Sequence, residues 1–522
     1  MSILSLEFLV MMVVLLAVNY CLPVRHRWFA LLAASLVFYA FSGWLGMIYL
    51  GVLTLLTWAG GLLMTRSREK EEAAAAEEDK AAAFRARKRR RRLLALIVLL
   101  VIGGMAVIKY ADLIHMGINW AYMALAERQE PLSAWNLIVP LGLSYFTFQS
   151  VGYVVDCARG KVQAEKNPMR YLLFVSFFPQ ITQGPITSWK QLAPQLRMPA
   201  RFDPAIFVSG FQLALWGYFK KLVVADRLSP VTTKLAGWSE QPGWIFLLGV
   251  VLYAIRLYAD FSGGMDVIRG AARMLGVDVT ENFRRPFFST SVAEYWRRWH
   301  ISLGAWFRNY LFYPLTTSRF GLALSKGGQR VLGKKLGRLL PGVVATFLIF
   351  FLIGIWHSAN WNAVIYGAYF GVMLSLALLL EPLFKKLRTL CHINPNAWWW
   401  KAVGLVRTWV LIVLAQYFAY TDSPTQAVKQ IGLTFRNWEF SDAAVRMTRL
   451  TEPLEWYIAA IGIFIVFLID FLCERGVDVN GKLARTTILI RWPVLILLII
   501  AILVFGCYGS GFDASAFLYT QF

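Results

Sequence analysis

The chain has 522 residues, of which 58% are hydrophobic and only 16% are charged, so it is far more apolar than an ordinary soluble domain. Its formal net charge of +23 would suit a nucleic-acid-binding protein, but the Lys and Arg residues cluster between apolar runs instead of lining one soluble face. The bias of basic loops toward the cytoplasm explains this charge, so we expect membrane lipids and no nucleic acid as partners.

Apolar runs long enough to cross a hydrocarbon core recur along almost the whole chain. They are continuously apolar instead of alternating, so the spans are expected to be helices and not strands of a barrel. We predict an all-α fold, a polytopic integral membrane helical bundle of about 11–13 spans with further re-entrant or interfacial helices. The predicted spans are 4–22, 28–41, 45–64, 93–109, 138–155, 171–186, 206–224, 244–258, 343–356, 364–380, 406–419, 457–472 and 494–507.

The most polar insert, 66–92, opens with an Ala/Glu-rich stretch and closes with the basic run RARKRRRR at 85–92. Such a run is typical of a cytoplasmic segment, here a helical hairpin that meets anionic headgroups. Counting spans from it places Arg25 and Arg27 in the cytoplasm and the N-terminus outside. The first run carries Glu7 and no preceding basic segment, so we expect a first span and not a cleaved signal peptide.

No clean span fits 263–338, although this stretch is rich in aromatic residues set among arginines. The aromatic residues in its second half are Trp296, Trp299, Trp306, Phe307, Tyr310 and Phe312. Amphipathic segments of this kind lie in the interface, or they enter the bundle where protein or a water-filled cavity surrounds them. We therefore predict a cavity here.

Two of the five histidines stand out by position. His357 ends one apolar run directly before another, and His300 lies among two arginines and two tryptophans. An ionisable group at membrane depth is expensive, which makes it a functional candidate, although a hydrogen-bonded structural histidine is the alternative for each. No H-E-x-x-H, G-x-S-x-G, P-loop or Cys/His zinc spacing occurs, so we expect no metal and favour general-base chemistry by a histidine.

Four motifs in chain order resemble the membrane-bound O-acyltransferase (MBOAT) family. They are YADFSGG at 258–264, ENF at 281–283 with Pro286, WRRWHISL at 296–303 and WHSANW at 356–361. PLGLSYFTFQ at 140–149 and QGPI at 183–186 resemble the bacterial branch that includes alginate O-acetylation enzymes. Ser358 departs from this branch, which usually has Gly after the histidine.

The resemblance implies one membrane-embedded domain over 1–522, with the charged cytoplasmic loop 66–92 and a catalytic core at 140–362. It implies a central funnel or tunnel in which His357 deprotonates the acceptor hydroxyl and His300 shapes the tunnel or assists proton transfer. The further residues expected to line it are Trp296, Trp299, Trp356, Asn360, Asp260 and Asn282. For the tryptophans plain packing is the alternative, and for Asp260 and Asp266 it is charge pairing with Arg269 and Arg273.

The function implied by the resemblance is O-acetylation of an exopolysaccharide at the inner membrane. The donor would be a cytoplasmic acyl thioester, either acetyl-coenzyme A or carrier-protein-bound, with no bound cofactor, and a periplasmic or surface protein would complete the transfer. Peptidoglycan O-acetylation and teichoic-acid D-alanylation remain alternatives within the family. A transporter or flippase would also show many spans and buried ionisable groups, but it predicts an internal repeat that we do not find.

Overall fold

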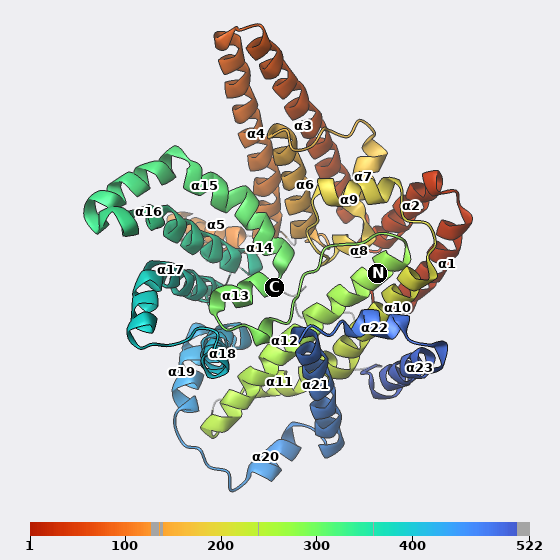
Figure 1. The fold of residues 1–522 in the computed structure, drawn as a ribbon, viewed down its shortest axis with the longest axis vertical. Coiled ribbons are helices and arrows are strands. Elements are labelled where there is room, and N and C mark those ends of the chain that lie inside the picture. The colour runs from red at the N-terminus through yellow and green to blue at the C-terminus, as the bar shows by residue number, and fades with distance from the viewer. Residues whose placement is uncertain (127–134, 136–138, 239, 359, 509–522) are drawn as a thin grey trace. The chain divides into compact units, whose positions relative to one another are not determined.

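The computed structural model describes residues 1–126, 135, 139–238, 240–358 and 360–508. Within these ranges all regular structure is helical, apart from one isolated antiparallel bridge between Phe283 and Trp299. The all-α prediction is therefore confirmed (Figure 1).

The chain divides into two compact units, the first formed by Met1–Phe211 with Ile268–Thr280 and the second by Gln212–Val267 with Glu281–Phe522. The helices that begin in the first unit are α1 (Leu6–Cys21), η1 (Val24–His26), α2 (Arg27–Ala40), α3 (Trp44–Ala76), α4 (Lys80–Lys109), α5 (Ala111–Ala126), α6 (Leu143–Ala158), α7 (Pro168–Ser176), α8 (Phe178–Ile181), α9 (Trp189–Arg197) and α10 (Pro204–Tyr218).

The helices that begin in the second unit are η2 (Phe219–Ala225), α11 (Asp226–Ala236), α12 (Gly243–Met274), η3 (Pro286–Phe288), α13 (Val292–Arg298), α14 (Ile301–Phe307), η4 (Arg308–Phe312), α15 (Tyr313–Thr317), α16 (Arg319–His357), α17 (Trp361–Leu390), α18 (Trp398–Tyr420), α19 (Pro424–Thr434), α20 (Ala443–Leu450), α21 (Pro453–Glu474), α22 (Val479–Arg485) and α23 (Ile488–Phe505).

Eight helices of the described ranges are long and apolar enough to cross a membrane, namely α3, α4, α12, α16, α17, α18, α21 and α23. The chain is thus a multi-pass membrane protein. The other predicted spans correspond to shorter helices, such as α1 with 16 residues and α2 with 14. The predicted span 171–186 is interrupted at Phe177, whose ψ of 108° separates α7 from α8 ahead of Pro179. Ile138, the start of another predicted span, lies outside the described residues.

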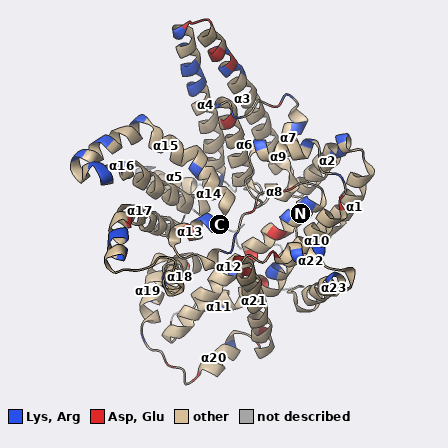
Figure 2. Cartoon of the chain, in the orientation of Figure 1, with Lys and Arg blue, Asp and Glu red and all other residues tan. Residues whose placement is uncertain are grey.

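The polar insert 66–92 forms the distal ends of α3 and α4, two long helices that pack along each other within the first unit (Figures 1 and 2). Asp79 caps α4 by accepting a hydrogen bond from the Ala82 N–H at 2.9 Å. Arg90 on α4 pairs with Glu71 on α3 at 2.9 Å. Because each helix runs unbroken from its apolar half into its charged half, the basic run directly continues a membrane span.

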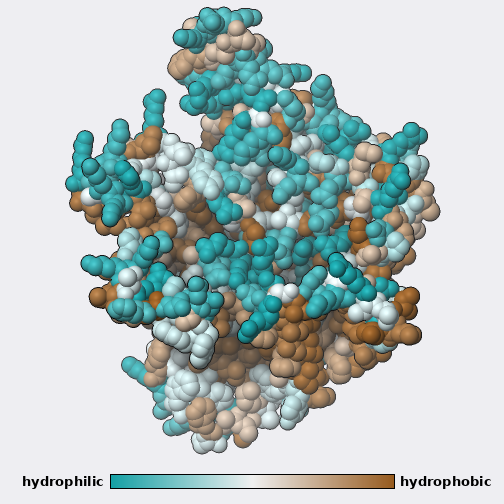
Figure 3. Space-filling model, in the orientation of Figure 1, coloured by the Kyte–Doolittle hydropathy of each residue, from teal (hydrophilic) through white to brown (hydrophobic). Residues whose placement is uncertain are grey.

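In the second unit, the part of α16 that follows a break at Gly333 packs along α17 (Figure 1). The two backbones touch at Gly354 and Gly367. A Cβ on Gly354 would lie 2.9 Å from Gly367 Cα, and a Cβ on Gly367 would lie 2.5 Å from Phe350 O. This approach fixes the end of α16 against the start of α17. Outward faces of the unit are apolar, as Figure 3 shows for α21 and α23, where Phe464 and Leu497 are exposed as lipid-facing residues must be.

Candidate active site

His300 lies at a sharp bend between α13 and α14, and the backbone around it is held by a short ladder. The Arg284 N–H donates to Arg298 O at 2.9 Å, and the Ile301 N–H donates to Asn282 O at 3.0 Å. His300 itself has φ 46° and ψ 55°, a left-handed conformation that costs a non-glycine residue about 1–2 kcal/mol. The surrounding hydrogen bonds therefore fix a strained residue, as occurs at preorganised functional sites.

The His300 side chain is 3% exposed and its orientation follows from Asn282. Asn282 Oδ1 accepts the Ser302 N–H at 2.9 Å and lies 3.4 Å from His300 Nδ1. Since this oxygen can only accept, His300 Nδ1 must carry the proton of a neutral ring, and Nε2 is left as the acceptor. Burial lowers the pKa of His300 well below its usual value, and the electrostatic interaction with His357 lowers it further, so the His300 ring is neutral at pH 7.

His357 is the last residue of α16, and it is half-buried. The ring of Trp356 lies edge-on to it at 4.6 Å between centroids. Ser358 follows in an extended conformation, and Ala359 lies outside the described residues. Asn360 caps α17 by accepting a hydrogen bond from the Ala363 N–H at 2.8 Å. The motif therefore ends one helix at the histidine and starts the next within a few residues.

Both histidines line one cavity of about 1460 Å³ that lies wholly within the second unit. It is larger than the roughly 300–1,000 Å³ usual for small-molecule sites. Its walls come from α13, α14, α16, α17 and α18. On α16 the lining residues are Thr346, Ile349, Phe350, Ile353 and His357, which recur at helical spacing and define one face. The cavity predicted for the aromatic stretch is thus present beside it.

Of the six further residues expected to line a tunnel, Trp296 and Trp299 line the cavity. The other four are not among its lining residues in the described part of the chain. Asn282 supports His300 from behind, Trp356 packs on His357, and Asn360 serves as a helix cap. Asp260 is 2% exposed and forms an ion pair away from the cavity, so its place is in the helix packing.

Charge pairing of Asp260 and Asp266 occurs, but it involves lysines that sequence reasoning did not consider. Lys221 Nζ lies 2.5 Å from Asp260 Oδ1, and Lys220 Nζ lies 2.7 Å from Asp266 Oδ2. Arg273, one of the expected partners, pairs instead with Asp278 at 3.0 Å. Two adjacent lysines inside the apolar run 206–224 were the signal that would have pointed to these pairs.

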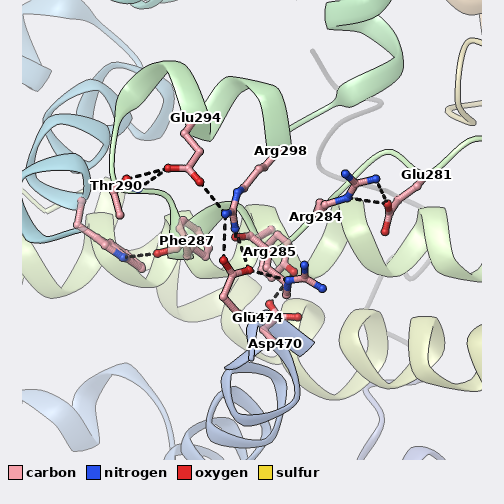
Figure 4. A network of polar contacts seen from close by, with 11 residues as sticks. Glu281, Arg284, Arg285, Phe287, Thr290, Glu294, Arg298, Asp470 and Glu474 are labelled. Carbon is pink, nitrogen blue, oxygen red and sulfur yellow. Dashed lines mark hydrogen bonds and ion pairs between the residues drawn. The ribbon is translucent and has the colours of Figure 1, made fainter. Parts of the chain in front are cut away.

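One wall of the cavity holds a network of charged residues that ties α13 to the end of α21 (Figure 4). Arg298 lies 2.6 Å from Glu294 and 2.9 Å from Glu474, and Arg285 also reaches Glu474 at 2.9 Å. Burial alone raises the pKa of Glu294, but hydrogen bonds from Thr290 and the charge of Arg298 outweigh it, and the net pKa is lowered. The spacing of Glu294 and Arg298 is visible in the sequence, whereas nothing there indicates Glu474.

Basic side chains outnumber acidic ones along the cavity. The basic lining residues are Arg284, Arg285, Arg297, Arg298, Arg308, Arg388, Lys401 and Arg407, against Glu294, Glu381 and Glu474. Arg388 lies near the C-terminal end of α17, Lys401 near the N-terminal end of α18, and Arg407 in the middle of α18. A cavity of this charge favours an anionic ligand. No group of three or more metal-binding side chains occurs in the residues that the structure describes.

Comparison with known proteins places this chain in a family. The profile of the membrane-bound O-acyltransferase family matches residues 141–332, which include His300. The chain is 31% identical over 385 residues to a probable alginate O-acetylase of Azotobacter vinelandii, covering 72% of this chain and 68% of the relative. It is 29% identical over 304 residues to a peptidoglycan O-acetyltransferase of Helicobacter pylori, with 52% of each chain covered.

A teichoic acid D-alanyltransferase of Bacillus subtilis is 27% identical over 303 residues, which cover 57% of this chain and 72% of the relative. The names of these relatives state O-acetylation of alginate, O-acetylation of peptidoglycan and D-alanylation of teichoic acid. The chain belongs to the membrane-bound O-acyltransferase family and is an O-acyltransferase enzyme.

Proposed function

We propose that this enzyme moves an acetyl group from a cytoplasmic thioester to hydroxyl groups of an exopolysaccharide outside the inner membrane. The observation that carries the proposal is the cavity lined by both histidines and by the basic residues Arg388, Lys401 and Arg407. Similarity to a probable alginate O-acetylase over most of the chain supports an acetyl donor and a polysaccharide acceptor.

We expect the donor to enter the cavity beside Arg388, Lys401 and Arg407. The α16 face runs from Thr346 to His357, eleven residues or about 16 Å at the rise of an α-helix. Arg388 and Lys401 lie at helix ends that the positive-inside rule places in the cytoplasm, with the N-terminus outside. A thioester on a phosphorylated carrier, either coenzyme A or a carrier protein, suits such a path because arginines bind phosphate. The enzyme itself would need no bound cofactor.

In the proposed reaction, His357 accepts the proton of an acceptor hydroxyl while the hydroxyl oxygen bonds to the thioester carbonyl carbon. The tetrahedral intermediate then collapses, the carbon–sulfur bond breaks, and the thiolate leaves with the proton that the His357 imidazolium returns. The products are an ester and a free thiol. With Nδ1 directed at Asn282, His300 offers Nε2 as an acceptor, which suits proton transfer and not donation to an oxyanion.

The acceptor polymer rests on the relatives alone, and the partner protein rests on the family resemblance of the sequence motifs alone. We propose an exopolysaccharide acceptor and a periplasmic or surface protein that completes the transfer. Peptidoglycan O-acetylation is the second candidate, supported by the Helicobacter pylori relative, and teichoic-acid D-alanylation is the third, supported by the Bacillus subtilis relative.

The test is ester content of the envelope polymers in cells that carry His357→Ala. We expect acetyl ester on the exopolysaccharide to disappear while the protein stays at its normal level in the membrane. His26→Ala is the matched control, because His26 is exposed and belongs to the other unit. Loss of ester from peptidoglycan alone, or of D-alanine alone, would select another candidate. Unchanged ester in all polymers would overturn the proposal.

A further inference from the structure

Two buried lysines of the second unit form ion pairs that the proposed reaction does not use. Lys220 is 4% exposed and Lys221 is 1% exposed, and both lie in η2, where the helix widens to π geometry. Lys221 Nζ reaches Asp226 at 2.8 Å and Asp260 at 2.5 Å. Lys220 Nζ reaches Asp266 at 2.7 Å. Neither lysine is among the described residues that line the cavity, so neither belongs to the proposed donor path.

The lysines hold η2 against one face of α12, and glycines bring the backbones together there. A Cβ on Gly217 would lie 2.5 Å from Gly263 O, and one on Gly263 would lie 3.1 Å from Lys221 N. Lys220 Nζ also donates to Ser262 Oγ at 2.9 Å. This close backbone contact, with ion pairs on either side, fixes how α12 is rotated about its axis and how far it is shifted along that axis relative to η2. π-Helical segments are frequent at functional sites, and here the segment directs two successive lysines to one neighbour.

Another face of the same turns of α12 holds the His300 bend. The ring of Phe261 lies edge-on to the His300 imidazole at 5.0 Å between centroids. Met265 Sδ accepts a hydrogen bond from Asn282 Nδ2 at 3.4 Å, and Asn282 in turn orients His300. Phe261 and Met265 therefore alternate along α12 with the residues that pair with the lysines, Asp260, Ser262 and Asp266.

Tyr258 provides a second connection from Lys220 to the same bend. Lys220 Nζ lies 5.9 Å from the centroid of the Tyr258 ring, and Tyr258 Oη donates to Asp470 at 2.7 Å. The Tyr258 ring contacts Phe283 edge-on at 6.2 Å, and it lies 6.3 Å from Trp299. Those two residues form the bridge that closes the ladder beside His300.

We infer that Lys220 and Lys221 are positioning residues for His300, acting through α12 on Phe261, Met265 and Tyr258. A role of His300 in acyl transfer rests on the proposed function. The placement of His300 by the two lysines does not depend on that function. Removal of either lysine takes a cation from beside a largely buried carboxylate, Asp266 for Lys220 and Asp260 for Lys221. Losing this attraction is destabilising, so we expect α12 to move or to admit water. A displacement of about 1 Å at a site of chemistry is enough to lower a rate about 10²-fold.

The test measures hydrogen–deuterium exchange in the purified full-length protein by mass spectrometry of peptides from 281–302. Lys220→Met is expected to raise exchange there about tenfold or more, because the Arg284, Ile301 and Ser302 amides form the ladder. Arg227→Met is the matched control. Arg227 is also buried, and it pairs with Glu455. Its hydrogen bonds reach α21 and the end of α23 and not the His300 bend. Exchange at 281–302 should stay unchanged in that variant.

Two milder variants separate positioning from general loss of the fold. Asp266→Asn keeps a polar partner for Lys220 and removes its charge, so it should raise exchange at 281–302 less than Lys220→Met. Lys220→Arg keeps the cation and should return exchange toward the wild-type value. Unchanged exchange at 281–302 in both Lys220→Met and Asp266→Asn would overturn the inference, and so would an equal rise in Arg227→Met.

Activity gives a second readout with acetyl-coenzyme A as the donor probe and the host polymer as acceptor. We expect Lys220→Met to lower kcat about tenfold or more with KM for acetyl-coenzyme A changed little, because the lysine lies off the proposed donor path. A wild-type protein that transfers no acetyl group would count against the proposed function, while the exchange result would still decide the positioning role.

Discussion

The two histidines of the cavity are built in opposite ways. His357 ends a long helix, is half-buried and is followed directly by an extended residue. His300 is 3% exposed, has a strained backbone and is held by Asn282 and Phe261. A residue that exchanges a proton with two reactants must be reachable by both, whereas a residue that sets geometry must not move. The contrast supports His357 as the reacting base and His300 as the fixed neighbour.

The largest effect is expected at His357. Replacing it with Gln keeps a polar side chain of similar length but removes the base, so kcat should fall about 10²-fold or more. The thermal unfolding midpoint should change little, since the residue is half-buried at a helix end. Purified protein assayed with acetyl-coenzyme A checks both values. A variant that retains most of its activity would remove the distinction between the two histidines.

Asn282 should give the next effect, and of a different kind. Asn282→Ala removes the acceptor of the Ser302 N–H and the partner of His300 Nδ1, both buried. We expect a loss of about 1–3 kcal/mol in the free energy of unfolding together with a lower kcat. Denaturant titration and kinetics on the same preparation measure the two. A fall in kcat without any loss of stability would show that Asn282 acts on the reactants and not on the His300 bend.

His300 should also make stability depend on pH. Its pKa is lowered in the folded protein, so the unfolded state binds the proton first as pH falls. The stability from the neutral ring is fully present above the unfolded pKa of about 6.5 and decreases below it, by at most about 1.4 kcal/mol per pH unit. Thermal unfolding of the wild type and of His300→Gln at pH 7.5 and pH 5.5 measures this loss of stability, because the two pH values lie about one unit on either side of the unfolded pKa. Parallel curves for the two proteins would contradict the assignment.

The smallest effect is expected at the charged wall of the cavity. The lowered pKa of Glu294 means that its contribution to stability is present above its unfolded pKa and is lost as pH falls through the lower folded value. Glu294→Gln should therefore make the free energy of unfolding depend less steeply on pH at acid pH. It should leave kcat near pH 7 within a few-fold of the wild-type value, since this side chain anchors α13. A large fall in kcat at neutral pH would instead place Glu294 among the groups that contact the donor.

The sequence by itself determined that the protein lies in lipid, that its spans are helices, and that His300 and His357 are the candidate functional residues. Continuous apolar runs permit only helices in lipid, and a histidine that ends such a run is expensive enough to be a candidate. An apolar run is not always one helix, because 171–186 is divided between α7 and α8. Hydropathy does not distinguish a segment that faces lipid from one that is buried inside the protein.

Only the tertiary structure decided which residues share the cavity and which support it. Asn282, Phe261 and Glu474 are separated from His300 by 18 to 174 residues. Their contacts with His300 or with Arg298 arise from the packing of distant segments, which no local pattern encodes. The lysine pairs depend on Gly217 and Gly263 allowing two helices to touch. Polarity is a property of single residues and can be read along the chain. Which side chains contact one another depends on distances that only the fold sets.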